Sequence, residues 1–290
     1  MSCLLCKNEN LKTVYNPPNA AGRALGRCSA CGLMQMSPMP SLQELSAYYQ
    51  KYDILGEREP YYEKLWLPEA LATPEGRDIL KRFNWAKGLC KKFGKTLDIG
   101  SGPGLFLKLV QDDGGEAIGC ELNLRAAAKS AALYGVRVYP GTIDQVAAAD
   151  FDVIALWDLL EHVDNPRHLI ASCHARLKPG GWLFIETPNE AALLDRTILT
   201  LLKLGIIGPA ATFYGLHHLA LFQKTTVRRL LEESGFAMVE IKGAATDPTR
   251  VFRGNGFKDK ITRLGLGILF LLARLVGRQN KMLIAAVKRT

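Results

Sequence analysis

The chain has 290 residues, of which 48% are hydrophobic, enough apolar material for one α/β domain of about 200 residues plus a small appendage. This composition excludes an intrinsically disordered chain. The net charge of +9 is concentrated in residues 250–290, where ten basic residues face one acidic residue, so the remainder is neutral overall. Such a basic stretch suggests an anionic partner, either a membrane surface or a nucleic acid.

The first residues contain two cysteines and no apolar stretch typical of a secretory signal, so we expect a cytoplasmic protein. Seven cysteines in that compartment do not indicate a disulfide framework. Four of them form two pairs, Cys3-x-x-Cys6 and Cys28-x-x-Cys31, separated by 21 residues. Two such pairs are typical of a structural Zn²⁺ site, and Gly32 is typical of a zinc-ribbon turn. A catalytic metal is not expected here.

Composition and motifs divide the chain into three parts. We expect a zinc-ribbon module in residues 1–40, which ends at a proline-rich exit, and a helical cap or linker in residues 41–93. Ser41 followed by Glu44 is a capping-box pattern. Residues 94–290 form the core domain, with apolar insertions at about 191–215 and 250–280.

Strand and helix patterns alternate from Lys95 onward. The expected strands are 96–99, 116–122, 136–139, 151–157 and 182–187, followed by two closing strands at 236–242 and 282–287. A helix over residues 168–177 is expected to end at Pro179-Gly-Gly181, and another is expected over residues 191–207. This alternation predicts an α/β fold with a Rossmann-like, seven-stranded, mostly parallel sheet and helices on both faces, plus the small zinc ribbon.

A glycine-rich turn follows the first strand of this core and opens a helix. Its sequence is Asp98-Ile-Gly-Ser-Gly-Pro-Gly104, and no Gly-Lys-Ser/Thr follows, which excludes a P-loop. Glycines let a ligand approach the main chain, and the helix N-terminus favours a negatively charged group. Glu121 lies 23 residues after Asp98, at the end of the second strand, where a carboxylate can accept hydrogen bonds from a ribose diol. These residues predict a nucleoside site.

The run from Thr96 to Asn189 resembles class I S-adenosylmethionine-dependent methyltransferases. The segments 151–163 and 177–189 resemble, more narrowly, the branch of ubiquinone-type O-methyltransferases and sugar methyltransferases. The N-terminal zinc ribbon is also similar to that of sugar C-methyltransferases. Ribosomal RNA guanine methyltransferases combine a zinc module with such a core as well, so an RNA substrate is a second reading.

The resemblance implies S-adenosylmethionine as methyl donor, S-adenosylhomocysteine as product, and a role for each matched residue. The methionine end of the cofactor would be lined by Gly100, Ser101, Gly102 and Gly104, and its amino group would be reached by Asp98. Glu121 would hold the ribose, and adenine would contact Leu122 on its face and Thr142 and Ile143 at its edge. The sulfonium would be bordered by Trp157 and Asp158. Many relatives carry an acid where this chain has Thr142, which puts the adenine amino contact in question.

Two adjacent histidines are candidates for a general base. The segment 214–222 resembles the His-Leu-x-x-Phe segment near the acceptor pocket of sugar methyltransferases, which places His218 at the base position, with His217 as a competing candidate. The alternative is a neutral histidine that orients a loop. His162, in a Glu-His pair, is usually structural in this family.

The stretch 257–281 combines aliphatic residues with arginines. Its uncharged part, Leu264–Ala273, has ten residues, whereas a spanning helix needs about 20. Arg263, Arg274 and Arg278 flank it, which suits an interfacial helix on an anionic membrane; a core or dimer-interface helix is the alternative. Nucleic-acid binding is less favoured, because the basic residues alternate with aliphatic residues rather than exposed aromatic ones.

We therefore expect an S-adenosylmethionine-dependent methyltransferase that acts on a small-molecule, sugar or lipid-linked acceptor, in the cytoplasm or peripheral on the inner face of the membrane. The other readings are an RNA methyltransferase and a non-catalytic methyltransferase-like binding protein.

Overall fold

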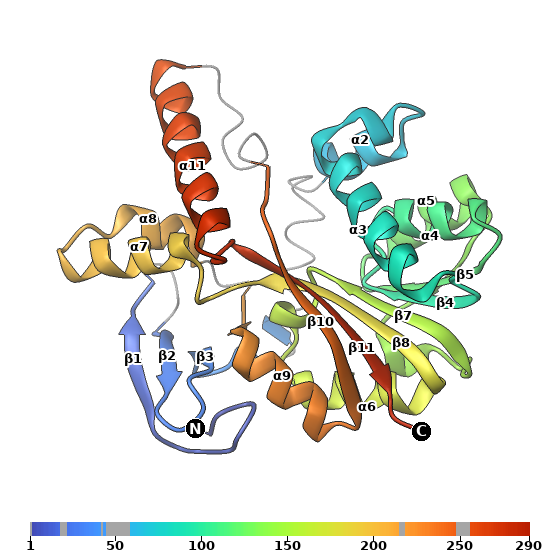
Figure 1. Cartoon of the computed structure of the whole chain (residues 1–290), viewed down its shortest axis with the longest axis horizontal. Helices are drawn as coiled ribbons and strands as arrows, with labels where there is room; N and C mark the ends of the chain where they lie inside the picture. Colours follow the sequence, from blue (N-terminus) through green and yellow to red (C-terminus); the bar gives the residue numbers. More distant parts are fainter. Residues whose placement is uncertain (1, 18–21, 42, 45–58, 215–217, 248–255) are drawn as a thin grey trace.

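The computed structural model describes residues 2–17, 22–41, 43–44, 59–214, 218–247 and 256–290, which form two sheets with helices around them (Figure 1). The larger sheet has seven strands in the order β10-β11-β8-β7-β4-β5-β6. Their bounds are β4 Lys95–Ile99, β5 Glu116–Glu121, β6 Arg137–Pro140, β7 Phe151–Trp157, β8 Leu177–Pro188, β10 Phe236–Ala244 and β11 Lys281–Lys288. The strands from β8 to β6 run parallel, and β11 lies antiparallel between β8 and β10. The predicted Rossmann-like, mostly parallel sheet is confirmed.

Helices cover both faces of this sheet. Their bounds are α2 Glu59–Trp66, α3 Pro74–Cys90, α4 Leu105–Asp112, α5 Leu124–Tyr134, α6 Pro166–Arg176 and α9 Lys224–Glu233, with single 3-10 turns η1 Ala70–Ala72, η2 Ile143–Gln145 and η3 Leu160–His162. On β7, Val153 and Ala155 join the core under α3 and α4, whereas Ile154 and Leu156 join the core under α6 and α9. Figure 1 shows α5 on the same side as α4. A strand buried on both faces explains the continuous apolar run of β7.

The ends of the helices follow local capping rules. Thr73 caps α3, because its Oγ1 accepts a hydrogen bond of 3.0 Å from the Gly76 amide, and Pro74 occupies the first helical position. Ser41 and Glu44 form the expected reciprocal pair, with 2.8 Å from the Ser41 amide to the Glu44 carboxylate and 3.2 Å from the Glu44 amide to the Ser41 hydroxyl.

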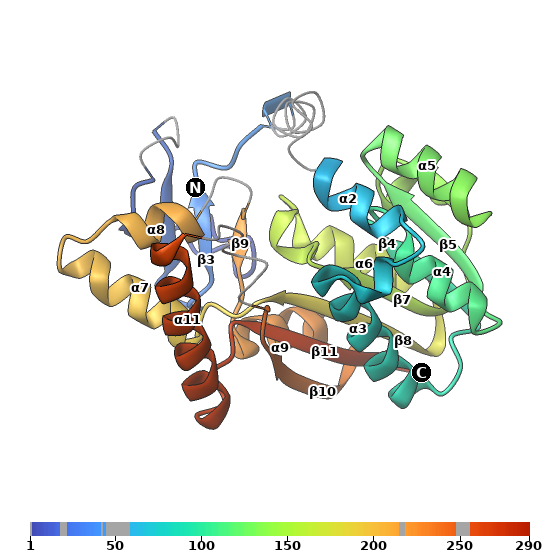
Figure 2. The same cartoon turned by 90° about the horizontal axis from the view of Figure 1, so that it is seen from above.

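The smaller sheet contains the ribbon hairpins and one strand from the core domain. Its order is β1-β2-β3-β9, with bounds β1 Leu11–Tyr15, β2 Ala24–Cys28, β3 Met34–Ser37 and β9 Ala220–Leu221. Beside it lie α7 Leu193–Lys203, α8 Gly208–Phe213 and α11 Phe257–Leu275 (Figure 2). Tyr15, Leu25, Ile198, Leu221 and Phe270 share one hydrophobic cluster there. The ribbon and the described parts of both apolar insertions therefore form one accessory lobe with a shared cluster, and Cys3, Leu5, Cys28 and Leu33 of the ribbon also join the core of the larger sheet.

Two expected boundaries were wrong. The helix expected over 168–177 is α6 and ends at Arg176, but the strand expected from residue 182 already begins at Leu177, which pairs with Phe151. The helix expected over 191–207 is α7 and ends already at Lys203, and α8 begins only at Gly208. Gly205, with φ of +82°, follows α7 in the left-handed conformation that stops a helix.

Candidate functional site

The glycine loop lies between β4 and α4, at the carboxyl end of the parallel strands. The amides of Gly100 and Ser101 both donate to the Cys120 carbonyl oxygen, at 2.8 and 3.1 Å, so the loop is tied to β5. Gly104 has φ of +78°, and a Cβ there would stand 2.8 Å from the Ser130 Cβ on α5. Only glycine permits both this conformation and this close packing. Strand order reverses between β4 and β7, and this crevice is where α/β sheets bind ligands.

Glu121 and Leu122 leave β5 beside the loop. One Glu121 carboxylate oxygen accepts from the Gly102 amide at 2.7 Å, and the other accepts from the Asn123 amide at 2.8 Å. Main-chain amides thus orient both carboxylate oxygens beside the loop, and the contact of Glu121 with a ribose stays a prediction. The Leu122 side chain is 57% exposed, so an apolar surface is open next to this carboxylate.

The adenine-edge residues lie in η2. Thr142 caps this turn: its Oγ1 accepts from the Asp144 amide at 3.3 Å and contacts the Gln145 Oε1 at 2.9 Å. Ile143 is buried. The Thr142 hydroxyl is therefore occupied by local bonds, and the contact of Thr142 and Ile143 with adenine stays a prediction.

Three buried polar atoms around the loop lack a hydrogen-bond partner among the described residues: Asp98 Oδ1, Ser101 Oγ and Trp157 Nε1. Burial raises the pKa of Asp98 well above its ordinary value, the nearby Arg82 guanidinium lowers it, and Glu121 raises it. Unsatisfied buried polar groups are rare in folded proteins and need an explanation. An acceptor at Asp98 suits an amino group, so these residues fit S-adenosylmethionine.

Helix α2 covers the glycine loop, which the sequence did not indicate. A Cβ on Gly102 would stand 3.7 Å from the Tyr62 ring, and Trp66 Nε1 donates to the Pro103 carbonyl oxygen at 3.0 Å. Lys129 on α5 holds its Nζ 4.0 Å from the centre of the Trp66 ring. Tyr62 and Trp66 thus cover the glycine loop from the side of α2.

Four charged side chains meet at the carboxyl ends of β7 and β8. Lys281 Nζ lies 2.6 Å from Asp158 Oδ1 and 2.7 Å from Glu186 Oε1, while Arg82 contacts the same carboxylates at 3.0 and 2.8 Å. Burial alone would lower the pKa of Lys281, but the Asp158 and Glu186 carboxylates raise it above its ordinary value. Asp158 has φ of +53°, a strained conformation for this residue type. The network holds Asp158 in place beside Trp157.

A second cluster of polar side chains lies at the turn η3. Leu159 packs against Gly100, and three residues later the His162 ring lies 5.1 Å from the His218 ring, measured between centroids. One candidate ligand atom each from Glu161, His162 and His218 lies within 4.8 Å of the others. Burial and the Asp158 charge raise the pKa of Glu161 to about 8, against the hydrogen bond from Thr187. His217 lies outside the described residues.

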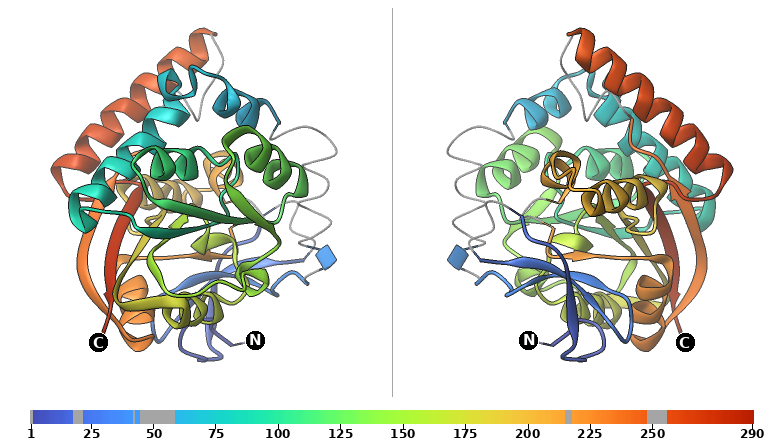
Figure 3. Two further views of the ribbon diagram at one scale, coloured as in Figure 1. Left: turned by 90° about the vertical axis from the view of Figure 1, so that its right-hand side faces the viewer. Right: turned by 90° about the vertical axis from the view of Figure 1, so that its left-hand side faces the viewer.

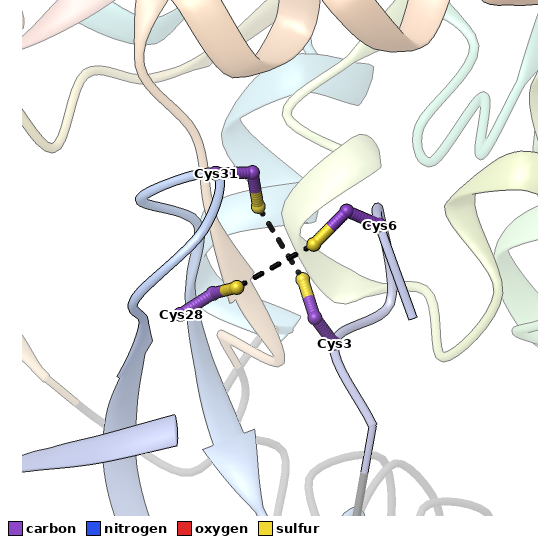
Figure 4. A group of neighbouring side chains, drawn as sticks. All are labelled: Cys3, Cys6, Cys28 and Cys31. Atoms are coloured by element: carbon purple, nitrogen blue, oxygen red, sulfur yellow. Dashed lines mark hydrogen bonds between the residues drawn. The ribbon is translucent and has the colours of Figure 1, made fainter. Parts of the chain in front are cut away.

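The four predicted zinc ligands converge at one point of the ribbon (Figure 4). The Cys3 and Cys31 sulfur atoms are 3.5 Å apart, as are those of Cys6 and Cys28, and all four lie within 4.8 Å of one another. A tetrahedral Zn²⁺ with Zn–S bonds of about 2.3 Å requires sulfur atoms about 3.8 Å apart. The donor set and its spacing therefore fit structural zinc.

The sheet, the glycine loop and the crevice between β4 and β7 define the class of the protein as an S-adenosylmethionine-dependent α/β methyltransferase. The family model of the methyltransferase domain matches residues 69–241, and the chain belongs to this family. The protein is thus an enzyme with S-adenosylmethionine as methyl donor.

The chain is similar to several known methyltransferases. Ubiquinone biosynthesis O-methyltransferase of Burkholderia pseudomallei (strain 1710b) is 31% identical over 195 residues, which cover 64% of this chain and 83% of that protein. The same enzyme of Azoarcus sp. (strain BH72) is 31% identical over 219 residues, covering 71% and 89%. The solved 1,6-didemethyltoxoflavin-N1-methyltransferase of Burkholderia thailandensis, with bound 1,6-didemethyltoxoflavin and S-adenosylhomocysteine, superposes with a TM-score of 0.56 at 15% identity, covering 93% and 97%. At this identity the structural likeness shows a shared fold. These relatives do not favour an RNA substrate or a non-catalytic module.

Proposed function

We propose that the enzyme methylates a small-molecule acceptor that binds between the glycine loop and the His162–His218 pair. This proposal rests on the short distance along the chain between the glycine loop and the two histidines. Leu159 packs on Gly100, and η3 then leads directly to His162 beside His218. Bound S-adenosylmethionine supplies an electrophilic methyl group. Transfer then requires an aligned acceptor and, for a weakly acidic hydroxyl, a base.

In this proposal the chain's own residues divide the work. Asp98 Oδ1 and the loop from Gly100 to Gly104 hold the amino-acid end, Glu121 holds the ribose, and Leu122 packs on adenine. Trp157 and Asp158 border the reacting side. His218 accepts the acceptor's proton through an imidazole nitrogen, and His217 is the second candidate for this step.

Calorimetry and a pH profile test these roles separately. S-adenosylhomocysteine should bind to the wild type and bind much more weakly to Asp98→Ala, whereas His218→Gln should retain binding. His218→Gln should lose turnover with a hydroxyl acceptor, and the pH profile of kcat should change with it. Unchanged turnover in His218→Gln would remove His218 as the base, and His217→Gln would then be the decisive variant.

The relatives support a narrower proposal for the acceptor. They are named ubiquinone biosynthesis O-methyltransferases, so we propose a hydroxyl acceptor of hydrophobic, lipid-linked character, with a sugar acceptor as the alternative suggested by the zinc ribbon. Methyl transfer from labelled S-adenosylmethionine to a prenylated dihydroxybenzene, compared with a prenyl-linked saccharide, distinguishes the two. Labelling of neither, with cofactor bound, would reject both acceptor classes.

We also propose that Cys3, Cys6, Cys28 and Cys31 hold a structural Zn²⁺. The carrying observation is the four-sulfur cluster described above. Metal analysis of the purified protein should give one zinc per chain, and Cys28→Ser should lower this content while Cys90→Ser, outside the cluster, should not. Equal zinc content in both variants would contradict the assignment.

We propose a peripheral contact with an anionic membrane through α11. The buried face of this helix, Leu266, Phe270 and Ala273, packs in the accessory lobe. A second apolar face is exposed and contains Ile261, Leu264, Ile268, Leu271, Leu272 and Leu275. Figure 3 shows α11 along the outer edge of the molecule. An exposed aliphatic face flanked by arginines suits an interfacial helix on an anionic bilayer.

Other exposed aliphatic residues, Leu204, Ile206 and Ile207, lie between α7 and α8. Within the described part of the chain, none of the helices combines the length and hydropathy needed to cross a bilayer.

Flotation with vesicles of anionic and neutral lipid tests the proposed membrane contact. The triple variant Arg263→Ala, Arg274→Ala, Arg278→Ala should lose flotation with anionic vesicles. The control Lys92→Ala, Arg137→Ala, Lys224→Ala, which removes the same charge elsewhere, should retain it. Equal flotation of the two variants would contradict the contact.

A further inference from the structure

The segment that carries His218 is held between the zinc ribbon and the core. On the ribbon side, β9 pairs with β3, and the Met36 amide donates to the Leu219 carbonyl oxygen at 2.9 Å. On the core side, the Leu219 amide donates to the Glu161 carbonyl oxygen at 2.8 Å. The residue next to His218 therefore links β3 of the ribbon to the turn η3 that contains His162.

An ion pair between Arg27 and a buried carboxylate fixes the far end of this segment. Arg27 on β2 places its guanidinium on both carboxylate oxygens of Glu190, with 3.0 Å from Nη1 to Oε2. Glu190 is only 3% exposed, and its amide donates to the Phe222 carbonyl oxygen at 2.9 Å. A bidentate arginine pair of this kind fixes geometry as well as charge.

The near end of the segment also contacts the ribbon. Tyr214 precedes His218 by four residues, and its ring lies 6.2 Å from that of Tyr15 on β1, measured between centroids. Both tyrosines belong to the hydrophobic cluster that includes Met34 and Leu221. The cofactor loop is held differently, because Gly100 and Ser101 bind to the Cys120 carbonyl of β5.

We propose that the zinc ribbon positions the methyl-acceptor side of the site. Through β3, Arg27 and Glu190, the ribbon fixes the position of His218 relative to His162. The cofactor site folds independently of the ribbon. This inference rests on the proposed roles of zinc and His218. It assigns the ribbon a task within the site, in addition to stabilising its own fold. Arg27 is a positioning residue, which acts on the acceptor side through Glu190 and the segment 218–222.

The test uses the full chain as purified, with and without zinc chelation, and three variants. Arg27→Met removes the ion pair with Glu190, and Arg27→Lys keeps the charge. Arg167→Met is the matched control, because Arg167 also binds the ribbon, at the Leu5 carbonyl oxygen, but attaches it to Glu233. The readouts are amide exchange in residues 219–222, the proton cross-relaxation between the His162 and His218 rings, and calorimetry with S-adenosylhomocysteine.

Arg27→Met should raise amide exchange in residues 219–222 about tenfold or more, the effect of one charged hydrogen bond on local opening. The cross-relaxation between the two histidine rings should be lost, Arg27→Lys should recover part of it, and Arg167→Met should retain it. S-adenosylhomocysteine affinity should stay within about twofold in all variants. Chelation should reproduce the Arg27→Met result.

Unchanged exchange and cross-relaxation in Arg27→Met would overturn the inference. A parallel loss of S-adenosylhomocysteine affinity would also overturn it, because the cofactor site would then depend on the ribbon. Protein that contains no zinc would reject the zinc proposal alone, since the Arg27 variants still decide the positioning role. Loss of turnover in His218→Gln is a separate measurement that tests the base.

Discussion

Lys281→Met should strongly destabilise the protein, because it breaks the four-charge network beneath the acceptor side. The Lys281 side chain is 13% exposed, and it lies within 2.8 Å of two carboxylates, of which Glu186 is 7% exposed. Removal of one partner from a buried ion pair costs about 3–5 kcal/mol, since the remaining charge is left without compensation. Arg82 still contacts both acids, so we expect about 3 kcal/mol, the lower end of this range.

Urea unfolding of the wild type, Lys281→Met, Glu186→Gln, their double variant and the control Lys178→Met measures this effect. In the double variant Lys281→Met, Glu186→Gln the unpaired buried charge is absent, so the two changes should be non-additive, with about 2 kcal/mol recovered. The control Lys178→Met breaks an exposed pair with Asp152, whose side chains are 46% and 37% exposed, and should cost about 0–1 kcal/mol. A loss below about 1 kcal/mol in Lys281→Met, or strict additivity in the double variant, would refute the electrostatic reasoning.

Two further predictions concern other parts of the site. Gly104→Ala should lower the free energy of unfolding by about 2–4 kcal/mol and abolish S-adenosylhomocysteine binding, because the added Cβ overlaps with Ser130 and the left-handed backbone is strained. The control Gly114→Ala has φ of +82° and open space around the added Cβ, so it should lower the free energy of unfolding by only about 1–2 kcal/mol. Equal losses on urea unfolding would contradict this. Burial raises the pKa of Asp195 to about 8, against the hydrogen bond from Tyr214. The folded state then holds a proton that the unfolded state releases, so wild-type stability should fall relative to Asp195→Asn as pH rises from about 4 to 8, by several kcal/mol at most. Parallel stability curves across this range would contradict the raised pKa.

The sheet could be predicted from sequence because its strands carry a strong local signal. Ile154 and Leu156 face one layer of helices and Val153 and Ala155 the other, so the strand is a continuous apolar run bounded by turns. The glycine loop was recognisable for the same reason, since its backbone geometry restricts the residues that fit. Glu121 followed from its fixed distance along the β4-to-β5 unit.

The partners of Asp158 could not be predicted. Arg82 and Lys281 reach it from positions 76 and 123 residues away, and no local pattern links them. The pairing of β9 with β3 was equally invisible, because a two-residue strand has no periodicity. Such contacts depend on how the accessory lobe packs, which only the three-dimensional structure gives.

The place of β11 in the sheet has a consequence for synthesis on the ribosome. A nascent chain that ends before residue 281 contains β8 and β10 but not the strand that lies between them. The edge of β8 is then open, and Glu186 lacks the ammonium group that compensates its charge. We expect a chain released after residue 280 to be protease-sensitive around β10 and to recruit chaperones, because protection requires the strand of residues 281–288.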